Sequence, residues 1–407
     1  MRWLHKVRLY PTERQADRLV FFLHLTRDLY NAALQQRRDV WQMRRRSVTH
    51  REQYAELTAL RKESARVASA YRECEDAVLH RLDLAFAAFF RRLKRGETPG
   101  YPRFKPAQRW TQLEFPHGDR ALKLDERQRK VRIPGVGAVP LRKGRAIPDY
   151  GRAFVVTKNG RWYAVFECER EPVPQPPTGK LVGMDRGIRS LLVLSDGTHI
   201  GNPKQVERRR GAVERHQRAL EKRTERDASR RVRNRQDPRR QAAVLRLARA
   251  NEREKNARRD FLHKCSRSLV LEHDAIIIEA LRVRNMLRSA RGTLESPGRG
   301  VKSKSGLNRA IADAGWGMLV TLMREKAEYA VRTIVEVPAK NTSRTCAECG
   351  NVAKGNRKGA VFACVRCGHR EDADVNAARV ILGRAQSALA TSALPPGNTR
   401  LNQHDAV

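Results

Sequence analysis

LVGMDRGIRSLLVLSDGTHI, residues 181–200, decides the fold of the second half of the chain. Two apolar runs lie on either side of a turn, and Asp196-Gly197 adds a second turn signal. The pattern predicts a strand hairpin with Asp185 at the end of its first strand. A charge at the end of a buried strand needs a partner, because burying an unpaired charge costs free energy.

Two further acidic residues occupy similar places downstream. DAIIIEAL (274–281) predicts a short buried strand that ends near Glu279, and DVNAARVILGRAQ (374–386) predicts a helix that begins at Asp374. The intervening elements are an Arg-rich helical stretch (203–264), an amphipathic helix (308–330) and a strand (333–339). This order matches an RNase H-like sheet, in which acids on the first and fourth strands meet one on the final helix.

Three carboxylates brought together repel one another unless divalent cations lie between them. Hard oxygen ligands suit Mg²⁺ or Mn²⁺, and two such ions roughly 4 Å apart can assist phosphodiester cleavage. Simpler interpretations remain open for each acid. Asp374 is equally suited to cap its helix, Asp372 competes with it for either role, Glu279 has many potential arginine partners, and Asp185 fits an ordinary turn.

Four of the seven cysteines form the pattern C-x2-C-x14-C-x2-C. These are Cys346, Cys349, Cys364 and Cys367. Two such pairs supply the four thiolates of a structural zinc site, and thiol exchange is the weaker alternative. The remaining cysteines, Cys74, Cys168 and Cys265, are predicted to be small buried hydrophobic residues.

The first half of the chain divides into helical and β-rich parts. Residues 1–10 predict a strand, 11–112 are mainly helical, and 113–170 contain short β-rich runs with a KNG hairpin turn at 158–160. A proline-rich linker at 171–180 is the predicted domain boundary. The tail, 387–407, is predicted to be disordered.

The charge of the chain indicates its class of partner. Lys+Arg 84 against Asp+Glu 44 gives +40, which favours a polyanion such as nucleic acid. A membrane partner is not expected, and the N-terminus has no apolar signal segment, so a cytoplasmic, nucleoid-associated location is predicted. Aromatic residues are few, so base stacking is not a dominant signal. The candidate nucleic-acid contacts are Arg103, Lys105, Arg208, Arg209, Arg210 and Arg344, although the Arg-rich stretch fits a solvated helix face equally well.

Several motifs together resemble the TnpB family of insertion-sequence proteins and the compact type V CRISPR effectors. They include LYPTERQADRL, GYPRFK, GMDRGIRS, IIIEAL, IADAGWG, TSRTCAECG and DADVNAA. The resemblance implies an α/β multi-domain protein. It comprises a RuvC-like, RNase H-like nuclease (181–341 and 371–386) with a zinc-ribbon insertion (342–370) that loads the target. It also implies a β-barrel wedge domain (1–10 and 113–170) that carries an inserted helical recognition lobe (11–112).

The resemblance also implies a guide-RNA-directed endonuclease for double-stranded DNA. Its catalytic acids would be Asp185, Glu279 and Asp374, with two Mg²⁺ or Mn²⁺ ions and one structural Zn²⁺. The protein would read a short flanking motif on the duplex. Arg186 departs from the family pattern as a cation beside the metal site, and Asp-Ala-Asp and LEKRTERDASR are further departures.

Two other functions remain open. One is an RNA-guided repressor that binds DNA with little or no cleavage. The other is a zinc-bearing RNA-binding protein without DNA targets. Self-association is also left open.

Overall fold

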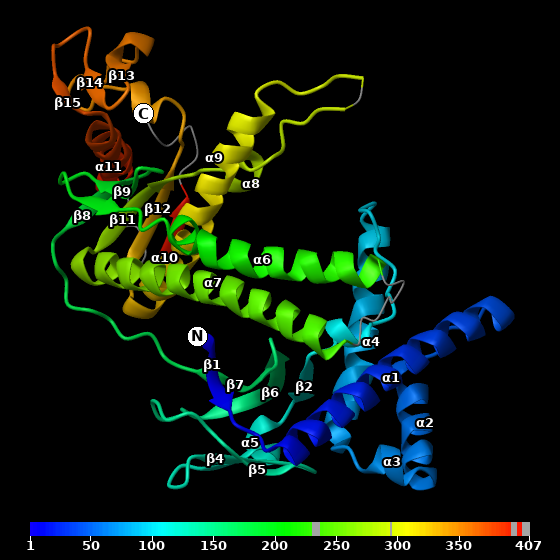
Figure 1. Cartoon of the computed structure of the whole chain (residues 1–407). Helices are drawn as coiled ribbons and strands as arrows, with labels where there is room; N and C mark the ends of the chain where they lie inside the picture. Colours follow the sequence, from blue (N-terminus) through cyan, green and yellow to red (C-terminus); the bar gives the residue numbers. More distant parts are fainter. Residues whose placement is uncertain (230–236, 294, 392–396, 401–407) are drawn as a thin grey trace. The chain divides into compact units, whose positions relative to one another are not determined.

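The computed structural model describes residues 1–229, 237–293, 295–391 and 397–400. The chain divides into two compact units, Met1–Arg170 and Glu171–Val407 (Figure 1). No helix in the described part of the chain has the length and apolarity that crossing a lipid bilayer demands.

The strands of the first unit form two antiparallel sheets. The order of the larger sheet is β1-β7-β6-β2, and that of the smaller one is β3-β4-β5. The strands are β1 (Arg2–Leu9), β2 (Gln112–Phe115), β3 (Lys123–Asp125), β4 (Lys130–Ile133), β5 (Gly137–Pro140), β6 (Tyr150–Lys158) and β7 (Arg161–Glu169). A bridge between Leu9 and Leu141 links the two sheets. Among the described strands the pairing does not close into a ring, so the single β-barrel that we expected is not formed.

The KNG turn lies where the sequence predicts it, between β6 and β7. Asn159 and Gly160 both have positive φ values, 52° and 67°, which a two-residue hairpin turn requires.

The helices of the first unit begin and end at recognisable signals. Thr12 and Gln15 form a capping box at the start of α1 (Glu13–Arg44). The other helices are α2 (His50–Glu63), α3 (Ala65–Ala68), α4 (Arg72–Lys94), α5 (Gly118–Ala121) and the 3₁₀ turn η1 (Ala107–Arg109). Gly96, just after α4, has a φ of 66°, the left-handed conformation that glycine commonly adopts at the end of a helix. The helices share one core with the larger sheet, since Leu34, Leu82 and Phe166 belong to the same buried cluster.

The second unit is built on a mixed sheet with the order β10-β9-β8-β11-β12-β16. Its strands are β8 (Leu181–Arg186), β9 (Ser190–Leu194), β10 (His199–Gly201), β11 (Ala275–Glu279), β12 (Thr333–Val337) and β16 (Gly397–Arg400). Strands β8, β9 and β10 pair antiparallel, whereas β11 lies parallel to β8 and β12. The first and fourth strands of this unit are therefore neighbours, as expected for an RNase H-like sheet.

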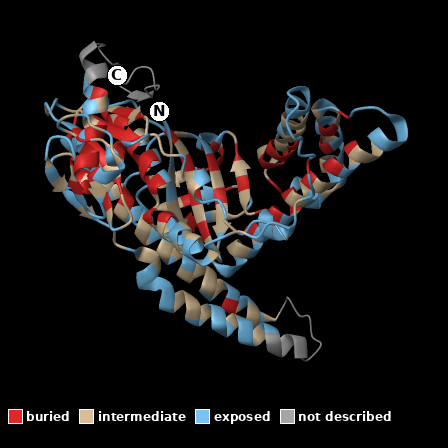
Figure 2. Ribbon diagram, turned by 90° about the horizontal axis from the view of Figure 1, so that it is seen from above, coloured by how far each residue is buried: buried red, intermediate tan, exposed pale blue. Residues whose placement is uncertain are grey.

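Alternate residues of these strands face different helices. On β11, Ile276 and Ile278 belong to a cluster that includes residues of α7 (Pro238–Glu272) and α10 (Trp316–Ala330). Ala275 and Ile277 instead belong to a cluster with Ile381 of α11 (Ala373–Thr391). Both faces of the sheet are thus covered, and Figure 2 shows the buried residues concentrated there.

Two long helices and a hairpin of shorter ones complete the second unit. The Arg-rich stretch forms α6 (Gln205–Ser229) and α7, which lie side by side. The shorter helices α8 (Val283–Met286) and α9 (Val301–Ala314) follow later in the chain. The prediction that this stretch is helical is confirmed for its described residues. Residues 230–236 lie outside the described part of the chain.

One expectation near the end of this unit needs correction. The tail does not become irregular at 387, because α11 continues to Thr391 and Gly397–Arg400 pairs in parallel with β12. The Pro-rich segment 171–180, the predicted linker, opens the second unit, which begins at Glu171, and hydrogen-bonds to it. The main-chain N–H of Val173 donates to Tyr329 O (2.7 Å), and Asp274 accepts from the N–H of Thr178 (2.8 Å).

The lone cysteines are mostly where we expected them. Cys74 and Cys168 are buried, whereas Cys265 is only half-buried.

Candidate metal and nucleic-acid site

Two of the candidate acids lie at the ends of adjacent parallel strands, Glu279 as the last residue of β11 and Asp185 as the last but one of β8. The pairing of β8 with β11 places Met184 beside Ile278, so Asp185 and Glu279 are the next residues on each strand. Glu279 lies on the same face as Ala275 and Ile277, because side chains alternate along a strand. That face is covered by α11, whose second residue is Asp374.

Gly183 explains how α11 comes close enough to bring the third acid to this edge. A Cβ at Gly183 would lie 2.1 Å from the main-chain oxygen of Ala378 and 2.7 Å from the nitrogen of Leu382. The helix backbone therefore touches the strand two residues before Asp185, on the same face. Ala378 is one helical turn after Asp374, so this contact directs the start of α11 toward Asp185. Only glycine fits this position, and sequence reasoning missed its role.

The two aspartates at the start of α11 have different roles. Asp372 Oδ1 accepts hydrogen bonds from the main-chain N–H groups of Asp374 (2.9 Å) and Val375 (3.1 Å). Asp372 therefore caps the helix, and the alternative that Asp374 is the cap is wrong. The side chain of Asp374 is instead paired with Arg357, at 2.7 Å.

The charges of the two other acids act on the carboxylate of Asp185. Burial, together with the negative charges of Glu279 and Asp374, raises the pKa of Asp185 to about 7. Burial also raises the pKa of Glu279, although a hydrogen bond from Thr342 and the charge of Arg186 oppose the rise. The negative charges of Glu279 and Asp374 therefore disfavour the ionisation of Asp185, and a divalent cation held beside these oxygens would relieve that effect.

Arg186, the cation beside the predicted metal site, has a main-chain partner. It follows Asp185 on β8 and belongs to the opposite face of the sheet, where Glu336 and Arg324 are among the charges that influence it. It is buried, and its guanidinium donates to the main-chain oxygen of Glu279. Arg186 therefore ties the ends of two strands together, and its charge interacts with those of Glu279 and Asp185.

Two further residues of this site come from the segment that follows β12. The hydroxyl of Thr342 donates to Glu279 Oε1, and Arg357 pairs with Asp374. Thr342 lies in the 3₁₀ turn η2 (Thr342–Arg344), and Arg357 begins β13 (Arg357–Lys358). No spacing pattern in the sequence indicates either contact, because both depend on how the cysteine segment folds back.

The four cysteines come together as the spacing predicts. Their sulfur atoms all lie within 4.8 Å of one another, with Cys346–Cys367 at 3.7 Å and Cys349–Cys364 at 3.6 Å. Four sulfurs bound at about 2.3 Å to a tetrahedral zinc ion lie roughly 3.8 Å apart. Hydrogen bonds from the main-chain N–H groups of Cys367 and Arg366 help to lower the pKa of Cys364 to about 6. The donor set therefore fits a structural zinc ion.

This cysteine segment is a small ribbon attached to the start of α11. It contains η3 (Lys354–Asn356) and a three-stranded sheet of β13, β14 (Val361–Ala363) and β15 (Arg370–Asp372). Ala373, the first residue of α11, is buried in a cluster with Phe362 and two of the cysteines. Asn376 donates to Thr345 O (2.8 Å) and accepts from Ala347 N–H (3.0 Å). The ribbon and the helix that carries Asp374 are thus held together directly.

The predicted nucleic-acid contacts are mostly exposed. The side chains of Arg103, Arg208, Arg209, Arg210 and Arg344 are at the surface, and Lys105 is half-buried. Arg210 forms an i,i+4 ion pair with Glu214 at 2.6 Å, which is the solvated-helix alternative at that position. Roles in nucleic-acid binding for the six residues stay predictions.

Three family models match parts of the chain. They are described as "Probable transposase" (residues 164–290), "Cas12f1-like, TNB domain" (316–381) and "Helix-turn-helix domain" (1–46). Residues 1–46 form β1 and the single long helix α1 here, rather than two helices joined by a turn.

Two curated proteins are similar over most of the chain. One is "Putative RNA-guided DNA endonuclease InsQ" of Escherichia coli (strain K12), 32% identical over 79% of this chain and 76% of that protein. The other is "Putative RNA-guided DNA endonuclease" of Streptomyces pristinaespiralis, 32% identical over 95% of this chain and 90% of that protein. "CRISPR-associated endodeoxyribonuclease Cas12f1" of Sulfoacidibacillus thermotolerans is 47% identical over a shorter stretch, 14% of each chain.

Among solved structures, "Structure of the mini-RNA-guided endonuclease CRISPR-Cas_phi3" aligns over 98% of this chain and 93% of that chain. The identity is 9% and the TM-score is 0.49, so no fold assignment follows from it. The similarity to the curated proteins is decisive, and the chain belongs to the TnpB family, to which the compact type V effectors are related.

Proposed function

We propose that this protein is an RNA-guided DNA endonuclease that cuts phosphodiester bonds at the carboxylate site of its second unit. The observation that carries the proposal is the placement of Asp185, Glu279 and Asp374 at one edge of the sheet, where burial and the charges of Glu279 and Asp374 raise the pKa of Asp185 to about 7. A structural role would not require this arrangement, since like charges held together destabilise a fold. The printed names of the two long relatives support the same activity.

The three carboxylates would hold Mg²⁺ or Mn²⁺, since they offer hard oxygen ligands. Such ions, when bound, supply the charge that activates water and stabilises the leaving oxygen in phosphodiester cleavage. Thr342 orients Glu279 through its hydrogen bond, and Asp372 caps the helix so that the carboxylate of Asp374 does not have to. Arg357 brings a positive charge to the same edge, which favours the approach of a phosphodiester.

The remaining parts of the proposal rest on family membership and charge. The guide RNA would pair with the target strand, and the protein would hold the heteroduplex by its backbone and read a short flanking motif on double-stranded DNA. The first unit would supply the wedge and recognition parts, and the cysteine ribbon would help to load the target. The net charge of +40 supports two polyanionic partners.

Plasmid cleavage tests the proposal. The purified protein, with the RNA that co-purifies, is incubated with Mg²⁺ and a target library that carries randomised flanking bases. We expect cleavage that requires RNA, metal and Asp185, with Asp185→Ala as the inactive control. Guide-dependent binding with no cut product, at metal concentrations from micromolar to millimolar, would instead identify an RNA-guided repressor.

A further inference from the structure

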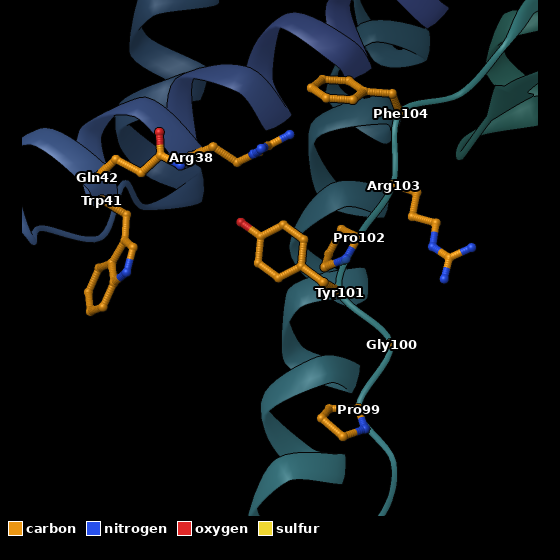
Figure 3. Close-up of a pocket in the computed structure, with 9 residues that line it drawn as sticks. All are labelled: Arg38, Trp41, Gln42, Pro99, Gly100, Tyr101, Pro102, Arg103 and Phe104. Carbon is orange, nitrogen blue, oxygen red and sulfur yellow. The ribbon is translucent and has the colours of Figure 1, made fainter.

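The first unit contains a pocket of about 550 Å³ between the end of α1 and the segment that follows α4. Figure 3 shows Trp41 and Tyr101 on opposite sides of it, with Arg38 reaching from α1 toward Phe104. All its lining residues belong to Met1–Arg170, so it is distinct from the carboxylate site. Its volume is that of a small-ligand site.

The aromatic walls of the pocket are exposed to water. The exposed fractions are 50% for Trp41, 44% for Tyr101 and 42% for Phe104. Packing within the unit does not account for three large apolar side chains left in contact with water around one cavity. Such a gathering is typical of a binding site rather than of a core.

The pocket is held in shape before any ligand binds. The ring of Tyr101 meets the rings of Phe86 and Phe89 edge-on, at 5.6 and 5.4 Å. Asn31 fixes the end of the segment to α1, since its side chain accepts from the N–H of Lys105 (2.8 Å) and donates to Lys105 O (3.1 Å). Pro99 and Pro102 further restrict the segment. A rigid aromatic surface loses little entropy when a ligand stacks on it.

The charge around the pocket indicates an anionic ligand. The guanidinium of Arg38 lies over the ring of Phe104 at 5.5 Å, on the wall of the pocket. Two exposed runs of basic residues adjoin the lining segments: residues 44–46, RRR, lie at the end of α1 on the Trp41 side, where Arg46 pairs with Glu52, and 91–95, RRLKR, precede Pro99. Flat aromatic walls within a basic surface match a ligand with a planar face and a phosphate, which is a nucleotide.

We propose that this pocket receives a single unpaired base of the bound nucleic acid and stacks it on Trp41 and Tyr101. Within a duplex, each base already has neighbours on both faces and is unavailable for such stacking. The site is therefore expected to distinguish single strands from duplexes. The ligand chemistry is common to RNA and DNA, so either the guide or an unpaired target strand qualifies as its source.

Binding of oligonucleotides to the full-length protein tests this proposal. The probes are fluorescent 12-mers of dT, of rU and of an abasic deoxyribose backbone, together with a 12-base-pair duplex, all measured without Mg²⁺. The ratio of the abasic dissociation constant to that of dT or rU isolates the contribution of the bases. Trp41→Ala and Tyr101→Ala should each lower that ratio by about 5- to 100-fold, and duplex binding should change by less than about twofold.

Two matched variants guard against indirect effects. Trp41→Phe keeps an aromatic face and should retain most of the base preference. Tyr54→Ala removes another exposed aromatic residue, on α2 and outside the pocket, and should leave the ratio unchanged. Whichever of rU and dT shows the Trp41-dependent ratio identifies the source of the base.

A ratio that Trp41→Ala and Tyr101→Ala both leave unchanged would overturn the proposal. So would an equal loss of single-strand and duplex binding, because that loss would show a general electrostatic surface. The inference rests on the proposed function only in its premise that the ligand is nucleic acid. Because binding is measured without metal, a failure of Asp185-dependent cleavage would leave it standing, and its own failure would not affect the nuclease proposal.

Discussion

Replacing Asp185 with Asn should abolish cleavage and yet stabilise the protein in the absence of Mg²⁺. The carboxylate is partly buried and lies close to the charges of Glu279 and Asp374, which together raise its pKa to about 7 from an ordinary value of 3.8. Asn is similar in size and carries no charge. It therefore removes both a ligand for the metal and a source of repulsion.

The sign and size of the stability change follow from that pKa. At pH values below 3.8 the acid is protonated in both the folded and unfolded states, and it contributes nothing. As the pH rises toward 7, only the unfolded state releases the proton, so the free energy of unfolding falls. At 1.36 kcal/mol per pH unit, the full penalty above pH 7 is about 4 kcal/mol. Asp185→Asn should recover up to about that amount at pH 8 and little near pH 4.

Thermal unfolding without added Mg²⁺ measures this gain. Chelators are omitted because they would also remove zinc. In a domain of about 150–250 residues, each kcal/mol shifts the Tm by about 2–4 °C, so the variant should unfold several degrees higher at pH 8. Adding Mg²⁺ should raise the Tm of the wild type and not that of the variant. Cleavage should fall by about 1,000-fold or more.

Asp196→Asn is the matched control, because this acid lies on the adjoining hairpin and its pKa is lowered rather than raised. Although burial acts against the effect, hydrogen bonds from Thr198 lower the pKa of Asp196. Its replacement should destabilise the protein at neutral pH. If Asp185→Asn gave no gain at pH 8, or a gain of equal size at pH 4, the account of the three carboxylates as mutually repelling metal ligands would be refuted.

Three other changes test separate parts of the structure. Gly183→Ala should cost about 1–3 kcal/mol in urea unfolding, since its Cβ would meet Ala378 O, whereas Gly201→Ala, in open space, should cost little. Cys364→Ser should lose zinc, and one zinc per chain in the purified variant would contradict this. Burial raises the pKa of Glu75 to about 7, so the free energy of unfolding should fall by about 3 kcal/mol between pH 4.5 and pH 7. Glu75→Gln should abolish that fall. If the variant kept the pH profile of the wild type, Glu75 would not be the cause of the fall.

The parts of the fold that the sequence predicts well are those set by short-range patterns. The apolar runs that end at Asp185 and Glu279 form neighbouring strands, because a strand buried on both faces must be apolar at nearly every position. The spacing of the four cysteines likewise fixes their convergence. In both cases the residues that identify the element also determine its geometry.

The missed features depend on contacts between distant residues. Gly183 is one of many glycines, and only the approach of α11 shows why it is there. Residues 397–400, GNTR, have no strand-like composition, and they pair only because β12 presents a free edge. Trp41 and Tyr101 are separated by a long stretch of chain, so no local pattern predicts that three aromatic residues lie around one pocket.

The position of the cysteine ribbon has a mechanical consequence for the carboxylate site. Ala373 belongs to the core of the ribbon, and the next residue, Asp374, belongs to the acid cluster. Because Asp374 directly follows a core residue of the ribbon, disorder in the ribbon would also displace the side chain of Asp374. The ribbon also supplies Arg357 from its own sheet. Zinc bound by the cysteines would therefore order two charged groups of the site, which accounts for a metal knuckle placed immediately before an acidic helix start in a strongly basic chain.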